Sequence, residues 1–90
     1  MSDRGFRALA DPTRRRILEL LAKRDRTAGD IAEQFPVAFS SISHHLNVLK
    51  TAGLVAATRE GQNIRYRLNT TVFQELMRHM MKLVGGNRHA

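Results

Sequence analysis

The sequence has no cysteine and no tryptophan, and it contains only two prolines and one tyrosine in 90 residues. Without cysteine the chain has no disulfide framework, no thiolate metal site and no thiol redox switch. No apolar run approaches the roughly 18 residues of a membrane span, and the first residues, MSDRGFRALAD, are charged throughout, which predicts no signal peptide. These absences predict a cytoplasmic protein without membrane insertion.

Acidic residues are scarce as well. Eight Asp and Glu face 15 Lys and Arg, for a net charge of +7, and twelve of the cations are arginine. This balance favours a polyanionic partner, and nucleic acid before a membrane surface. No nucleophile–base constellation, phosphate-binding loop or paired carboxylates in a plausible cleft can be recognised, so the sequence does not predict an enzyme.

The length favours one small domain, residues 1–90. A chain of this size buries only a modest fraction of its unfolded surface. Chains of this size often complete their hydrophobic core with a second subunit, so we expect a homodimer.

The most informative segment is AFSSISHHLNVLKTAGL, residues 38–54, which has the period of an amphipathic helix. One face is apolar and consists of Ile42, Leu46, Leu49 and Gly53. The other is polar and consists of Ser40, Ser43, His44, Asn47 and Thr51. Short hydroxyls, an imidazole and a carboxamide can exchange hydrogen bonds with base edges and phosphates at close range. The segment therefore predicts a DNA recognition helix at about 40–52.

Three shorter helices are predicted before this segment. The first covers about 4–10. An Asp-Pro pair, an N-cap followed by proline at the first helical position, opens a second helix over about 12–23. Thr27, with an acidic residue three positions later, opens a third over 28–35, which a proline ends.

After the recognition helix the period changes to that of a strand. Residues 55–68 predict a β-hairpin with a turn at 61–63, in which Ile64, Tyr66 and Leu68 face inward and Arg65 and Arg67 face outward. A last amphipathic helix follows at about 70–84. The fold class is therefore mostly α with a small β-hairpin: a winged helix-turn-helix, the hairpin being the wing, with added N- and C-terminal helices.

Five strings of the sequence resemble, in this order, the ArsR/SmtB family of bacterial winged-helix repressors, and within it an autorepressor branch. They are ALADPTRRRIL (8–18), TAGDIAEQF (27–35), SSISHHLNVLK (40–50), AGLV (52–55) and REGQNIRYRLN (59–69). The resemblance implies a homodimer, paired through its first and last helices, that binds a near-palindromic operator in the nucleoid and represses transcription. Control by the protein's own abundance, by a sequestering membrane partner protein or by an unrecognised ligand at the dimer interface stays open.

The resemblance also implies functional positions. DNA contacts carried over from the family are Ser40, Ser41, Ser43 and His44 in the helix, and Arg59, Gly61 and Gln62 in the wing. The polar face and the hairpin add Asn47, Thr51, Arg65 and Arg67. The expected dimer interface is apolar and consists of Phe6, Leu9, Val72, Phe73, Leu76, Met77, Met80, Met81, Leu83 and Val84. One departure is Ala38, where relatives often have Ser or Asn as N-cap, and the cap could pass to Ser40.

The metal-binding positions of the family can be checked in the same way. Its Cys-x-Cys site is replaced by Asp30-Ile31-Ala32, and its site of one acid and three histidines by Thr70, Val72, Leu83 and Gly86, none of which binds zinc in the required way. We therefore expect no metal at these sites and no cofactor. Two alternatives stay open: a metal- or small-molecule-responsive repressor with an unrecognised site, and a winged-helix protein-interaction module. The second predicts a hydrophobic or acidic recognition face.

Several residues also have a purely structural interpretation. His44 and His45 are neighbours on a helix and point about 100° apart, so they cannot chelate one ion as an i, i+4 pair can. For His45 we favour packing or a structural hydrogen bond. Among Arg14, Arg15 and Arg16 we expect at least one structural group, and a contact to phosphate by another stays open.

Overall fold

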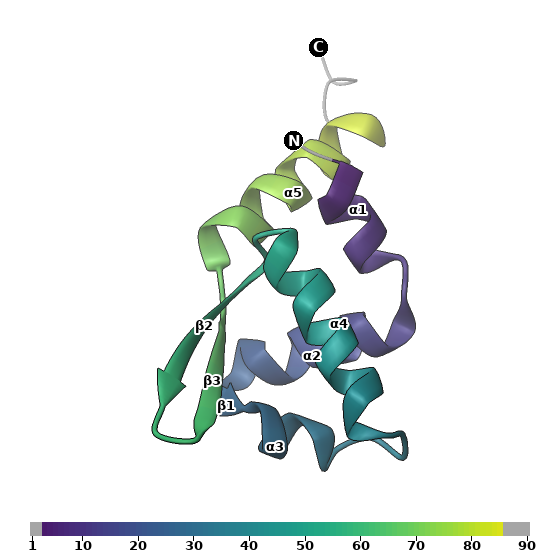
Figure 1. Cartoon of the computed structure of the whole chain (residues 1–90). Coiled ribbons are helices and arrows are strands. Elements are labelled where there is room, and N and C mark those ends of the chain that lie inside the picture. The colour runs from purple at the N-terminus through teal and green to yellow at the C-terminus, as the bar shows by residue number, and fades with distance from the viewer. Residues whose placement is uncertain (1–2, 86–90) are drawn as a thin grey trace.

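The computed structural model describes residues 3–85 as five helices and a three-stranded sheet (Figure 1). The helices are α1 (Asp3–Leu9), α2 (Pro12–Lys23), α3 (Ala28–Ala32), α4 (Phe39–Thr51) and α5 (Thr70–Leu83). The strands are β1 (Arg26–Thr27), β2 (Val55–Glu60) and β3 (Asn63–Leu68). Across these described residues no helix combines the length and the apolar character needed to cross a bilayer.

Capping side chains explain where three of the helices begin. Asp11 before α2, Thr27 before α3 and Asn69 before α5 each accept a hydrogen bond from the backbone N–H three residues later, at 3.1, 3.1 and 3.3 Å. The first two caps confirm the prediction. Helix α4 follows Ala38 and has no side-chain cap. Ser40 is already the second residue of this helix, so the cap does not pass to it.

The ends of α3 and α4 follow from short-range hydrogen bonds. Helix α3 stops at Ala32, three residues before the predicted end, because the N–H groups of Gln34 and Phe35 donate to carbonyls three residues earlier instead of four. Helix α4 ends in a Schellman motif: Gly53 takes φ +80, and the N–H of Leu54 donates to the carbonyl of Leu49 at 3.0 Å. This sharp end turns the completely buried Leu54 into the core.

The sheet has the antiparallel order β1-β3-β2. Gly61 takes φ +61 at the first of the two residues between β2 and β3, as a type II′ hairpin turn requires. Strand β1 was not predicted. It has only two residues, Arg26 and Thr27, which lie opposite Tyr66 and Arg65. The pairing joins the connection between α2 and α3 to the base of the hairpin.

The core collects apolar side chains from every helix and from β2. Its buried members are Ala8, Ile17, Leu18, Leu21, Ile31, Ile42, Leu46, Leu49, Leu54, Val55 and Leu76. The predicted apolar face of α4 is confirmed at Ile42, Leu46 and Leu49. Leu76 was predicted in the dimer interface, but it is fully buried within the protomer and belongs to its core. Its Cδ1 would lie 3.2 Å from a Cβ on Gly5, so the missing side chain of Gly5 lets α1 and α5 approach.

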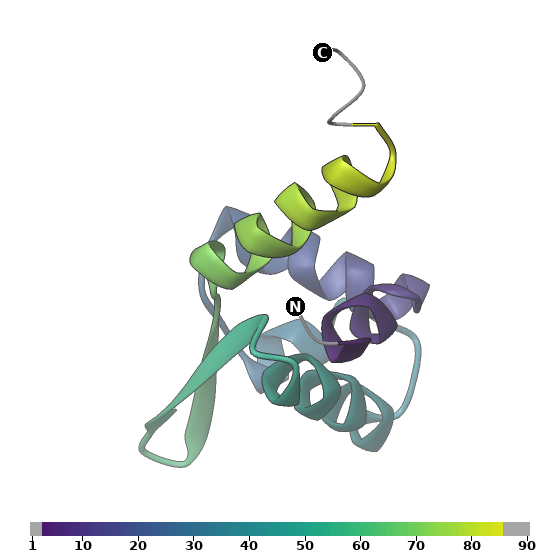
Figure 2. The ribbon, with the colours of Figure 1, turned by 90° about the horizontal axis from the view of Figure 1, so that it is seen from above.

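The hairpin extends beyond the helices, as the two views in Figures 1 and 2 agree. Tyr66 and Leu68 lie near its base and pack partly against the core, as predicted. Ile64 lies toward the tip and is 39% exposed, so the prediction that it faces a core is wrong. The reason is that the core ends before the strand does.

Candidate nucleic-acid interface

The polar face of α4 is open to solvent. Ser40, Ser43, His44, Asn47 and Thr51 are all exposed, and Ser41 is partly buried. The opposite face of the helix is closed, because Ile42, Leu46 and Leu49 are at most 1% exposed. Packing therefore fixes which side of α4 faces outward, and five of the six predicted helix contacts lie exposed on that side.

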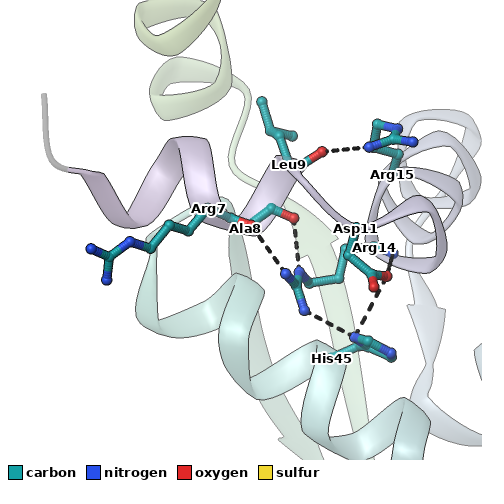
Figure 3. A network of polar contacts seen from close by, with 7 residues as sticks. All are labelled: Arg7, Ala8, Leu9, Asp11, Arg14, Arg15 and His45. Atoms are coloured by element: carbon teal, nitrogen blue, oxygen red, sulfur yellow. Dashed lines mark hydrogen bonds and ion pairs between the residues drawn. The ribbon is translucent and has the colours of Figure 1, made fainter.

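One arginine of α2 holds α4 against the end of α1 (Figure 3). Arg14 donates from Nε to the carbonyl of Ala8 at 2.8 Å and from Nη2 to the carbonyl of Arg7 at 3.0 Å. Its Nη1 lies 3.2 Å from Nδ1 of His45 on α4. Arg14 thus ties together the last carbonyls of α1, the start of α2 and the helix with the polar face.

The chemistry of this contact sets the state of His45. A guanidinium can only donate, so Nδ1 of His45 accepts and the ring proton lies on Nε2. The imidazole is 15% exposed, whereas His44 points to solvent. The structural interpretation of His45 and the expectation of a structural arginine are therefore confirmed. Arg15 is a second structural arginine, because it donates to the carbonyl of Leu9 at 2.8 Å.

Asp11 completes the network. Its Oδ2 accepts from the backbone N–H of Arg14 at 3.1 Å and lies 3.9 Å from Nδ1 of His45. Partial burial acts to raise the pKa of Asp11, but the hydrogen bond from the backbone N–H of Arg14 and the charge of the Arg14 guanidinium outweigh it, so the pKa of Asp11 lies below its usual value. The carboxylate therefore stays charged at neutral pH and continues to cap α2.

The predicted wing residues do not lie on one face of the hairpin. Arg59 lies opposite Ile64, on the face that carries Tyr66 toward the core, whereas Arg65 and Arg67 lie on the other face. Gly61 and Gln62 form the exposed tip, and Arg59 and Arg67 are exposed as well.

Arg65 differs from these residues because it is partly buried and already has an acidic partner. Its Nε lies 2.7 Å from Oε2 of Glu60, and the hydrogen bond and charge of that carboxylate raise the pKa of Arg65. Arg65 is consequently the least available of the predicted wing cations.

The predicted dimerisation residues divide into two groups. Met80, Met81, Leu83 and Val84 are exposed, by 38%, 62%, 71% and 73%. Apart from Leu76, which belongs to the core, the other predicted residues are partly buried against the core: Phe6, Leu9, Val72, Phe73 and Met77. Several of them line a cleft of about 460 Å³ between α2 and α5. An apolar surface at the end of α5 is thus uncovered in the single chain.

A second groove lies between α1 and α4, and the sequence analysis predicted functional residues on its α4 side but none on its α1 side. It has a volume of about 210 Å³ and is lined by Arg4, Arg7, Asn47, Val48, Thr51 and Ala52. For the α1 side the sequence signal was the i, i+3 spacing of the two arginines, which places them on one side of a helix.

No metal centre is evident in the part of the chain that the structure describes: residues 3–85 contain no group of three His, Cys, Asp or Glu placed to hold an ion. Of the four positions that correspond to the family's site of one acid and three histidines, Gly86 lies outside the described residues.

One known family and a known repressor match this chain in sequence. The model of the family described as bacterial regulatory protein, arsR family, matches residues 11–57, which include α2, α3 and α4. The transcriptional repressor SdpR of Bacillus subtilis (strain 168) is 53% identical over 79 residues, or 88% of this chain and 88% of that protein.

Two solved structures resemble the whole arrangement. A crystal structure of a possible transcriptional regulator for arsenical resistance matches with a TM-score of 0.83 at 35% identity, over 94% of this chain and 86% of that chain. The solution structure of the homodimeric winged helix-turn-helix DNA-binding domain of a possible regulator from Mycobacterium bovis matches with a TM-score of 0.74 at 32% identity, over 98% of this chain and 85% of that chain.

Proposed function

Because the chain belongs to the bacterial arsR family of regulatory proteins, we propose that it is a sequence-specific transcriptional repressor that binds a near-palindromic operator as a homodimer. The observation that carries this proposal is the exposed polar face of α4, which presents Ser40, Ser43 and His44 from a helix otherwise fixed in the core. This face is neither apolar nor acidic, so it does not favour a protein-interaction module.

The dimer is proposed to form through α1 and α5. The exposed apolar side chains at the end of α5 favour burial, and the solved regulator from Mycobacterium bovis is homodimeric. Two protomers related by a two-fold axis would place their α4 helices about one DNA turn, near 34 Å, apart in successive major grooves. An operator that overlaps a promoter would then exclude polymerase.

The wing contributes to DNA binding outside the major groove. Arg59, Gly61 and Gln62 are exposed near the tip of a hairpin that extends beyond the body of the protein. A protruding, cationic hairpin can reach the flanking backbone or minor groove. Arg67 adds a charge on the opposite face, whereas the carboxylate of Glu60 partly neutralises Arg65.

The mode of regulation is proposed from the resemblance of the sequence to the autorepressor branch of the family. The protein would repress its own gene in the bacterial cytoplasm, where the nucleoid presents the operator, and a partner protein that sequesters the dimer would relieve repression. The metal-binding positions of the family carry residues that cannot bind zinc in the way those sites require, so we propose no metal response through them.

The test is binding of the purified protein to the DNA upstream of its own gene, compared with random duplex at the same salt concentration. His44→Ala should weaken operator binding by about 1–3 kcal/mol, or roughly 5- to 150-fold, because the substitution removes a side chain that reads a base. Binding to random duplex should change little. Gln74→Ala, an exposed polar change on α5, is the control and should leave both affinities unaltered.

Two outcomes contradict the proposal. The first is equal affinity of the wild-type protein for the upstream DNA and for random duplex, across all segments tested by footprinting. The second is a protein that binds its operator tightly yet sediments as a monomer at micromolar concentration.

A further inference from the structure

The groove between α1 and α4 has a charged wall and a polar wall. Arg4 and Arg7 come from α1, whereas Asn47 and Thr51 come from α4. The side chains of Arg4, Asn47 and Thr51 are exposed, and that of Arg7 is accessible from the groove. The groove therefore differs from the cleft between α2 and α5, which is lined mostly by apolar side chains.

No carboxylate among residues 3–85 forms an ion pair with the cations of this groove. Within residues 3–85 the ion pairs are Arg16–Glu19 and Arg65–Glu60, and neither includes Arg4 or Arg7. Two unpaired guanidiniums on one side of a helix, facing a carboxamide and a hydroxyl, form a site for a multiply oxygenated anion.

The two walls are held at a fixed separation. Arg14 binds the carbonyls of Arg7 and Ala8 at the end of α1 and, through the same guanidinium, His45 on α4. Figure 3 shows the side chain of Arg7 extending away from this network, so its carbonyl serves the network while its guanidinium is free to bind elsewhere. A preorganised groove loses little conformational entropy when an anion binds.

We propose that this groove binds a backbone phosphate of the operator, so that α1 contacts DNA in addition to its role in pairing the protomers. The inference rests on the proposed function, because α4 must lie in the major groove to bring a phosphate to its neighbour α1. Arg4 and Arg7 supply the charge, and Asn47 and Thr51 donate hydrogen bonds to phosphate oxygens. Asn47 and Thr51 thereby position the protein on DNA and do not read bases.

The experiment measures how operator and random-duplex affinity depend on salt for the full-length dimer. The double variant Arg4→Ala/Arg7→Ala should make the slope of log K against log salt less steep, by about 0.9 for each phosphate that the protein no longer neutralises. The change in slope should be the same for the operator and for random duplex. Asn47→Ala should weaken both complexes by a similar factor. Arg78→Ala is the charge control, because it removes one exposed guanidinium from α5, which the proposal does not place on DNA, and its slope should stay at the wild-type value.

A second measurement guards against loss of fold or pairing in the double variant. Arg4→Lys/Arg7→Lys keeps both charges and should retain the wild-type salt slope. In ethylation interference, one phosphate per half-site should block the wild-type protein when ethylated and should lose that effect with Arg4→Ala/Arg7→Ala.

An unchanged slope together with an unchanged interference pattern overturns the phosphate site while leaving operator binding intact. Absence of any operator preference in the wild-type protein instead refutes the proposed function itself.

Discussion

Replacing Arg14 by methionine should lower the stability of the fold without changing any residue of the exposed polar face of α4. The change removes three interactions and keeps a long, unbranched side chain. The bond to the carbonyl of Arg7 is exposed, so water replaces it at little cost. The bonds to Ala8 and His45 are partly buried, and their removal leaves a carbonyl and an imidazole nitrogen without a donor.

The expected cost follows from those two hydrogen bonds. A hydrogen bond to a charged group contributes about 1.5–3 kcal/mol, and partial exposure reduces this, so we expect a loss of about 2–4 kcal/mol in the free energy of unfolding. In a domain of this size each kcal/mol lowers Tm by about 4–8 °C. Urea and thermal unfolding should be followed at one fixed protein concentration, because dimer formation makes stability depend on concentration.

Arg15→Met is the matched control. It removes a single, exposed hydrogen bond to the carbonyl of Leu9 and should cost less than about 1 kcal/mol. An equal effect of the two substitutions would refute the reasoning, since it would show that Arg14 does not hold α1, α2 and α4 together.

Three further predictions follow from the core, the capping network and the metal positions. Leu76→Ala should cost about 2–5 kcal/mol of unfolding free energy, whereas Met81→Ala should weaken dimer formation measured by sedimentation and change protomer stability little. Because the pKa of Asp11 is lowered in the folded state, its carboxylate stabilises the fold above about pH 4, and this stabilisation is lost as the pH falls through the folded-state pKa. Asp11→Asn should therefore reduce the loss of urea stability at acidic pH, and an unchanged loss would contradict this prediction. Stoichiometric zinc should leave operator affinity unchanged in a titration with tag-free protein, and a tenfold loss would contradict this expectation.

The features that the sequence predicted well are local. The caps at Asp11 and Thr27 depend on residues three positions apart, and the two faces of α4 depend on a period of 3.6 residues. Short-range patterns of this kind can be predicted from the sequence because the interacting groups are close together in the chain. The same applies to the hairpin turn at Gly61.

The features that it missed depend on contacts between distant segments. Strand β1 exists only because Arg26 and Thr27 meet β3, and two residues carry no period of their own. Leu76 belongs to a helix with a broad apolar face, and periodicity alone cannot tell which residues face the protomer core and which a partner. The Arg14–His45 contact and the groove beside Arg7 likewise need the packed helices.

The pairing of β1 with β3 has a consequence for how the chain folds. Thr27 pairs with Arg65, and the residues between them form α3, α4 and β2. Because this chain segment is long, forming the contact has a large loop-closure cost in conformational entropy. During synthesis α2, α3 and α4 emerge before β3 does. We therefore expect α2, α3 and α4 to collapse before β1 pairs with β3, so that the wing is attached to the body of the protein late in folding.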